Sequence, residues 1–313
     1  MSTETVMPPE VFNQKFLDKL ESGAVKEAAD AGTSFIRRRL REDGFLRKIL
    51  PPQPLGNQDL DRVLTHDKPV RIEDIEPTAV AAKSVPFGEI ADLDYFYGPK
   101  FLVPFARILT PEETKDIDEL RTYRMDIRRV LMDNMLKDMM TEEDGKFIAT
   151  VDSIVGAENS VQAETGLVQH KGINSGITRS SYKEVLKILE QAKLNNGTVL
   201  MNRLTAKEFL GFDRSAIGGD LAERIFTDGL SALTEARIFG VRHLFTIKTE
   251  IVPNNVVYVF AEPNYLGKFY TLQDATVHME KKKYFIKFMA YETIGAAIGN
   301  IAGVAKVTFH PTT

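Results

Sequence analysis

Two groups of acidic residues are the side chains of this sequence with the clearest potential for chemistry. Asp92 and Asp94 stand two residues apart in an acidic and aromatic stretch, and Glu142, Glu143 and Asp144 are consecutive. Paired carboxylates can bind a divalent cation or act as general acid and base. The first pair falls on a predicted loop tip and the second group at a predicted helix end, where solvated acids are common. We therefore expect neither a catalytic nor a metal-binding role for them.

No other motif for catalysis or cofactor binding occurs in the sequence. A glycine-rich turn at residues 218–220 lacks the preceding strand and the following lysine of a phosphate-binding loop. The chain holds no cysteine, which excludes disulfides, thiolate metal sites and cysteine nucleophiles. The histidines lack the short spacings of zinc sites; they are His66, His170, His243, His278 and His310. We predict no cofactor, no metal and no enzyme activity.

A cluster of arginines lies near the N-terminus. Its members are Arg37, Arg38, Arg39 and Arg41. Three interpretations stay open: a solvated helix face paired with nearby acids such as Glu42 and Asp43, a contact with an acidic surface of a neighbouring subunit, or a contact with nucleic-acid phosphates. The net charge of −4 gives no whole-protein argument for nucleic-acid binding.

Length and composition indicate a folded, soluble protein of about two domains. The chain has 313 residues, of which 43% are hydrophobic. Its N-terminus lacks the basic region and apolar run of a secretory signal. The longest uncharged segment, Thr293–Ala305, is too short to span a membrane. Its glycines lie four residues apart and predict a buried helix with close backbone packing; they are Gly295, Gly299 and Gly303.

The first 109 residues contain pieces without a core of their own. Residues 1–58 alternate short amphipathic stretches with breakers, which predicts an arm that packs on something else. Within residues 59–109, two strands at 80–87 and 100–108 flank a tip that is rich in aromatic side chains. Those aromatic residues are Tyr95, Phe96 and Tyr97. A long two-stranded loop is marginally stable alone, so the tip requires a partner surface.

The segment from Thr110 to Gly145 predicts one long helix. Thr110 is suited to the N-cap, and the proline and acidic residues that follow it are typical of a first helical turn. Apolar residues then recur at helical spacing, with Ile127 in the middle of the buried stripe. No helix breaker occurs before Gly145. We therefore predict a spine helix over residues 111–140, followed by a strand at 146–155.

The remaining sequence alternates strands and helices without regular βαβ repetition, which predicts the α+β class. A short buried strand over 198–202 ends at Asn202 and is followed by a helix. Further strands are predicted at 241–252, 255–261, 268–272 and 283–289, with a last one at 305–309.

This order of parts resembles the major capsid protein of tailed bacteriophages, whose shell fold is shared by encapsulins and the herpesvirus capsid floor. One motif that carries the resemblance is strand-Asn-x-x-Thr-helix at 199–206. The other is the closing strand, turn and final strand at 285–292 and 305–309, reached after 275–279. Many relatives carry a long N-terminal scaffolding region, and no such region is recognisable in this sequence.

The resemblance implies a division of the chain. Residues 1–58 correspond to an N-terminal arm, 59–109 to an extended loop that overlaps a neighbour, 110–199 with 290–313 to a peripheral domain, and 200–289 to an axial domain. The arginine cluster and the loop tip would then make intersubunit contacts.

The resemblance also implies a structural function: the chain forms a shell and has no enzyme activity. Identical chains would form pentamers and hexamers, and these would close an icosahedral head around double-stranded DNA. Scaffold, portal and decoration proteins are the expected partners, with no membrane. The protein would be made in the host bacterial cytoplasm and reside in the virion. Two alternatives are an encapsulin-like compartment that encloses protein cargo, and a metal-dependent enzyme that uses Asp92 and Asp94.

Overall fold

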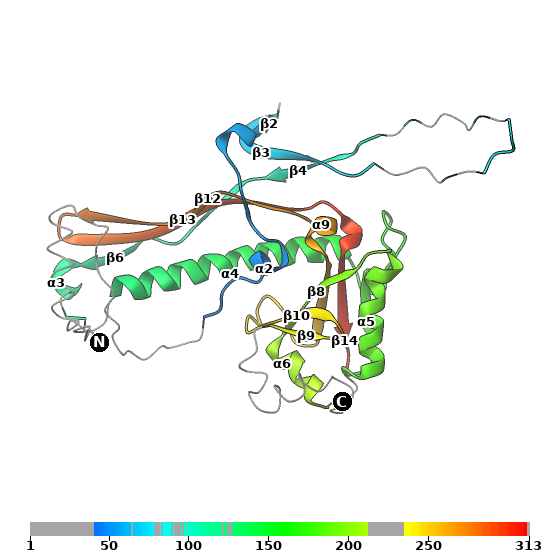
Figure 1. Ribbon diagram of the computed structural model, residues 1–313. Coiled ribbons are helices and arrows are strands. Elements are labelled where there is room, and N and C mark those ends of the chain that lie inside the picture. The colour runs from blue at the N-terminus through cyan, green and yellow to red at the C-terminus, as the bar shows by residue number, and fades with distance from the viewer. Residues whose placement is uncertain are drawn as a thin grey trace, which may run out of the picture.

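The molecule is built around one long helix that runs beside a long sheet and ends at a second sheet (Figure 1). The computed structural model describes residues 41–63, 65–77, 82, 84–88, 90, 95, 97–120, 122–123, 127–211 and 235–311. The long helix is α4, Ile127–Val155. The mixture of helices with mainly antiparallel sheets confirms the predicted α+β class.

The first sheet is a long β-hairpin with shorter strands along its edges. Its strands are β1 (Gln53–Pro54), β5 (Ala106–Leu109), β6 (Glu113–Asp116), β12 (Gly267–Lys282) and β13 (Phe285–Ile298). The order is β1-β12-β13-β5, with β6 also paired to β13. Along β13, Ile286, Phe288 and Ala290 alternate with more exposed residues and lie buried. This period of two places one face of the hairpin against the core.

The second sheet has two buried faces. Its strands, in sheet order, are β7 (His170–Ile173), β14 (Val304–Phe309), β11 (Val256–Ala261), β8 (Asn196–Asn202), β10 (Val241–Thr246) and β9 (Glu235–Ile238). On β11, Tyr258 and Phe260 join the core beside α4, whereas Val257 and Val259 join a second core beside helix α5 (Arg179–Gln191). This strand is therefore apolar throughout.

A three-stranded sheet forms the base of the extended loop. It consists of β2 (Asp61–Val63), β3 (His66–Asp74) and β4 (Lys100–Pro104), all antiparallel. The loop projects away from the two larger sheets (Figure 1). The predicted strand at 100–108 is therefore two strands, β4 and β5. The described residues between 82 and 88 form no strand.

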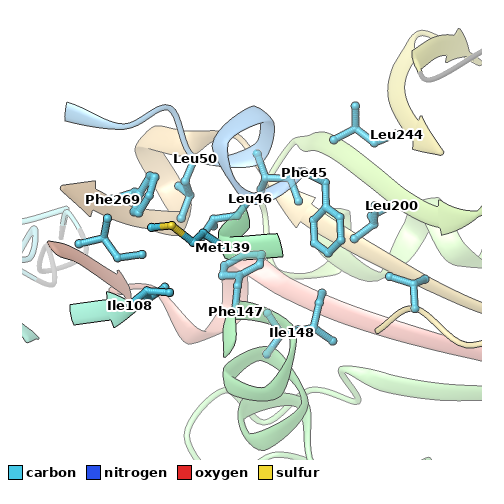
Figure 2. Packing of buried hydrophobic residues seen from close by; sticks show 14 of the residues in the cluster. Phe45, Leu46, Leu50, Ile108, Met139, Phe147, Ile148, Leu200, Leu244 and Phe269 are labelled. Atoms are coloured by element: carbon cyan, nitrogen blue, oxygen red, sulfur yellow. The ribbon is translucent and has the colours of Figure 1, made fainter. Parts of the chain in front are cut away.

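The main core includes residues from the predicted arm. The short helix α2 (Leu46–Ile49) packs on the middle of α4, and Phe45, Leu46, Ile49 and Leu50 are all buried. Figure 2 shows Phe45, Leu46 and Leu50 beside side chains of α4 such as Met139. Residues 45–50 therefore belong to the folded body of the chain.

The predicted spine helix at 111–140 is wrong in position. Residues 113–116 form β6, a four-residue helix α3 follows at Ile117–Leu120, and α4 begins only at Ile127. Pairing of β6 with β13 overrides the local helix-start signal. At the other end α4 continues through Gly145 to Val155, where a strand was predicted. The buried residues Phe147, Ile148 and Val151 have helical spacing that their β-favouring side chains conceal.

The helix predicted for Thr293–Ala305 is also wrong. Gly295 lies in β13, and Gly303 ends a 3₁₀ turn at Ile301–Gly303 before β14. The small residues do serve close packing, as predicted, but in strands and turns. The other short helices are α6 (Arg203–Ala206) and α9 (Pro263–Leu266), with 3₁₀ turns at Asn57–Asp59 and Lys207–Gly211.

Candidate assembly surfaces

The extended loop exposes large apolar side chains that make no core of their own. Phe87 and Ile90 are almost fully exposed, and Tyr95 and Tyr97 are 82% and 79% exposed. The two tyrosine rings contact each other edge to face, with centroids 5.1 Å apart. Solvent exposure of such side chains on a projecting hairpin is typical of a protein–protein contact. Asp92, Asp94 and Phe96 lie outside the described residues.

The base of this loop is fixed by close packing on the end of β13. Phe105 lies over Gly295, where an added Cβ would be 3.0 Å from the Phe105 ring. Phe101 lies over Gly299 with the same clearance. The glycines therefore allow two aromatic rings to approach the backbone and set the direction of the loop. Gly303 allows another close approach, to the carbonyl oxygen of Tyr265.

Polar contacts also hold the loop base. The Tyr270 hydroxyl of β12 donates to Glu73 Oε1 of β3 at 2.6 Å, and Arg71 Nε donates to the same oxygen at 3.0 Å. Burial and the bond to Glu73 raise the pKa of Tyr270 to about 12. Beneath the base runs a groove of about 800 Å³, whose lining includes Asp74 and Lys268.

The last residues of the predicted arm are tied to the body by charged groups. Arg41 pairs with Asp138 of α4 at 3.1 Å, and not with its neighbours in sequence. Glu42 accepts from Thr246 Oγ1 and from the backbone N–H of Ile247, both at 2.9 Å, and pairs with Arg203. Arg37, Arg38 and Arg39 lie outside the described residues.

Asp144 is a buried attachment point and not a solvated acid. Its carboxylate accepts hydrogen bonds from the backbone N–H groups of Phe45 and Leu46 at 3.2 and 2.8 Å. Lys248 Nζ lies 2.6 Å away. Burial raises the pKa of Asp144 to about 6, although the Lys248 ammonium acts in the opposite direction. The expectation failed because α4 continues past this point and turns Asp144 toward the core.

Arg47 joins two buried glutamates from different elements. Its Nη2 donates to Glu143 Oε1 of α4 at 2.7 Å and to Glu292 Oε2 of β13 at 2.9 Å, while Nε donates to Glu143 Oε2 at 3.0 Å. Burial and the adjacent negative charge of Glu143 raise the pKa of Glu292 to about 8. Hydrogen bonding to Glu143 raises the pKa of Arg47. Glu292 was not predicted from the sequence, because it lies within β13 and no local pattern singles it out.

The other residues singled out in the sequence have structural positions. Thr110 does not cap a helix; its hydroxyl accepts from the Ala290 N–H at 2.8 Å and extends the contact of β5 with β13. Asn202 does cap α6, as its side chain accepts from the Leu204 N–H at 2.7 Å. Ile127 is half-buried against the main core at the first residue of α4.

Over the described ranges, His, Asp and Glu side chains do not gather in any group of three or more that could hold a metal ion. In that part of the chain no helix has both the length and the apolar character of a membrane span.

This arrangement of loop, long helix and two sheets is the phage capsid fold. No protein-family model and no curated protein matches the sequence. Among solved structures, a chain of the capsid of the cyanophage P-SCSP1u matches with a TM-score of 0.64 at 8% identity, covering 91% of this chain and 93% of that one. The capsid of an empty GTA particle matches with a TM-score of 0.62 at 15% identity, covering 91% and 96%. The capsid of the cyanophage Pam1 matches with a TM-score of 0.61 at 9% identity, covering 90% and 96%.

Proposed function

We propose that this chain is the head-shell protein of a tailed phage or a related particle. Copies assemble into pentamers and hexamers, and these close an icosahedral shell around double-stranded DNA. The observation that carries the proposal is the exposure of the contacting tyrosine rings Tyr95 and Tyr97 on the extended loop. The fold shared with phage capsid chains over nine-tenths of the length supports it.

The parts of the subunit take their roles from this assembly. Residues 59–109 form the extended loop that overlaps a neighbouring copy, and residues 1–58 form an arm whose last part is seated on its own body. Residues 110–199 with 290–313 form the peripheral domain, and 200–289 the axial domain. The role is structural and not enzymatic. Portal, scaffold and decoration proteins are further partners, and the virion is the site of function.

Electron microscopy of the purified chain after size-exclusion chromatography tests assembly. We expect shells, tubes or capsomer rings from the unaltered chain, alone or after co-expression with scaffold proteins. The double variant Tyr95→Ser with Tyr97→Ser should give folded subunits that do not close shells, because the tip loses its apolar contact area. The matched variant Tyr95→Phe with Tyr97→Phe keeps both rings and should still assemble. Normal shells from the serine variant would contradict the role of the tip.

Two further experiments test the role of the arm and the identity of the enclosed cargo. Deletion of residues 1–40 removes most of the arm and leaves the buried residues from Phe45 onward in place. We expect that variant to fold and to lose closed shells. Nuclease-resistant double-stranded DNA inside particles from the producing cells supports a phage head, whereas enclosed protein cargo would favour an encapsulin-type compartment.

A further inference from the structure

We infer that Arg47, Glu143 and Glu292 form a proton-dependent latch that keeps residues 45–50 seated on α4 and β13. We call residues 45–50 the arm seat. The inference rests on the proposed function, because it concerns how the arm of a shell subunit is attached to its body. It adds that pH controls this attachment, which the fold alone does not imply.

The latch joins three parts of the chain that are far apart in sequence. Arg47 belongs to the arm seat, Glu143 to α4 and Glu292 to β13. One guanidinium nitrogen, Nη2, contacts both carboxylates, at 2.7 and 2.9 Å. The side chains of Glu143 and Glu292 are 0% and 1% exposed. Two carboxylates buried against a single cation cannot both ionise without leaving one charge uncompensated.

One oxygen of the cluster marks where the proton resides. Glu292 Oε1 is buried and has no hydrogen-bond partner within the described part of the chain. An unpaired acceptor that carries full negative charge costs more than an unpaired neutral group. The geometry therefore places the proton of the pair on Glu292, because both oxygens of Glu143 already accept hydrogen bonds from Arg47.

The charged groups around the latch do not supply a second cation. Asp274 of β12 lies 3.5 Å from Arg47 Nη1, is largely exposed, and adds negative charge. Lys146 lines the same cavity as Glu143 but is exposed and pairs with Glu142 at 3.5 Å. Asp144 and Lys248 balance each other next to the latch. Loss of the proton from Glu292 therefore adds one uncompensated negative charge beneath the arm seat.

The direction of the pH effect follows from the raised pKa of Glu292. The seated form holds this proton up to about pH 8, whereas an opened, hydrated Glu292 would lose it at an ordinary carboxyl pKa. The seated form therefore binds the proton more tightly, and its advantage declines as pH rises from about 4.5 to about 8. Above that range both forms are ionised and the equilibrium no longer depends on this group. Rising pH favours release of the arm seat.

Thiol labelling of the full-length subunit measures release directly. The chain has no cysteine, so Leu50→Cys places one buried thiol in the arm seat. Its labelling rate with a maleimide is divided by the rate of the unfolded chain at the same pH, between pH 5.5 and 9. We expect protection to fall with rising pH, by up to tenfold per unit, and to level off near pH 8. Constant protection in this background would overturn the inference.

Three further substitutions in that background identify the group responsible. Glu292→Gln should remove the pH dependence above pH 6, where Asp144, whose pKa is raised to about 6, has already lost its proton. Glu143→Gln should also remove it above pH 6, since Arg47 and Glu292 then form a balanced pair, and this variant serves if Glu292→Gln fails to fold. Glu280→Gln changes an exposed carboxylate on β12 and should keep the original slope. An unchanged slope in folded Glu292→Gln would overturn the latch.

The labelling result and the assembly result can fail independently. Labelling uses the unassembled subunit, and microscopy at one fixed pH tests shell formation. A pH slope without shells under any condition would leave the latch and reject the shell function. Shells from a chain whose arm seat shows no pH slope would support the shell function and reject the latch.

Discussion

The carboxylate of Asp144 in α4 accepts a hydrogen bond from the backbone N–H of Leu46, 98 residues earlier, at 2.8 Å. The same carboxylate pairs with Lys248, so one side chain joins the arm seat, α4 and the loop after β10. This contact explains why residues that look like a detached arm in the sequence are part of the subunit core.

Replacing Asp144 should therefore be costly. Asp144→Asn keeps the size of the side chain but leaves the buried Lys248 ammonium without a counter-charge, for which we expect a loss of about 3–5 kcal/mol in the free energy of unfolding. Urea denaturation measures it. Glu142→Gln, on the exposed side of the same helix, should change stability by less than about 0.5 kcal/mol. Equal effects of the two variants would contradict the role of Asp144.

The glycine in the middle of α4 can be replaced to advantage. An added Cβ at Gly145 would lie 4.0 Å from Ile251 Cδ1, which is ordinary van der Waals contact. We expect Gly145→Ala to raise the free energy of unfolding by about 0.5–1 kcal/mol, because alanine restricts the unfolded chain and favours helix. Thermal denaturation measures it. Gly156→Ala is the contrasting variant: with a φ of +66° and Gln162 Nε2 only 2.3 Å from an added Cβ, it should destabilise.

Gly295 should not tolerate a side chain. A Cβ there would be 3.0 Å from the Phe105 ring and 3.1 Å from the Pro104 carbonyl oxygen, so the loop base must shift. We expect Gly295→Ala to cost about 1–3 kcal/mol, as overpacking does. Ala296→Ser, at the exposed neighbouring position, should be nearly neutral. Denaturation curves of the two variants that coincide would show that this contact adjusts without cost.

Thr110 offers a test between a cap and a strand contact. Thr110→Val keeps the shape but leaves the N–H of the buried residue Ala290 without its acceptor, at an expected cost of about 1–3 kcal/mol. Helix content by circular dichroism should stay the same, because no helix begins at this residue. A loss of helical signal in the folded variant would restore the cap interpretation.

The stabilising contribution of two buried carboxyl groups should decline as the solution becomes less acidic. The pKa values of Asp144 and Glu292 are raised to about 6 and about 8, so the folded chain binds both protons more tightly than the unfolded chain. The contribution of each group is present at low pH and is lost as pH rises to its folded pKa. Each group gives a slope of at most about 1.4 kcal/mol per pH unit. Below pH 6.5 the lowered pKa of buried His243 acts in the opposite direction, so the test is urea denaturation between pH 6.5 and 9. Stability should fall with rising pH in that range, and Glu292→Gln should flatten the curve there.

The sequence by itself determined the class, the strands β8, β10, β11 and β14, and the first half of β13. The apolar run of β11 and the alternation in β13 indicate strands because period two is a local property of the chain. The cap at Asn202 is equally local, since donor and acceptor are two residues apart. The order of arm, loop, long helix and sheets was enough to suggest the capsid fold that the solved structures confirm.

Only the tertiary structure decided where the long helix lies and what the acidic residues do. Thr110 and the acids after it satisfy the rules for a helix start, yet Thr110 contacts Ala290 of β13 and Glu113 pairs with β13 as the first residue of β6. These partners are too far away in the sequence for a local pattern to reveal them. Glu143 and Asp144 look solvated until residues 45–50 and β13 cover them. Their burial, and the raised pKa values of Asp144 and Glu292, depend on contacts that no local pattern records, which is why the latch could not be predicted from sequence.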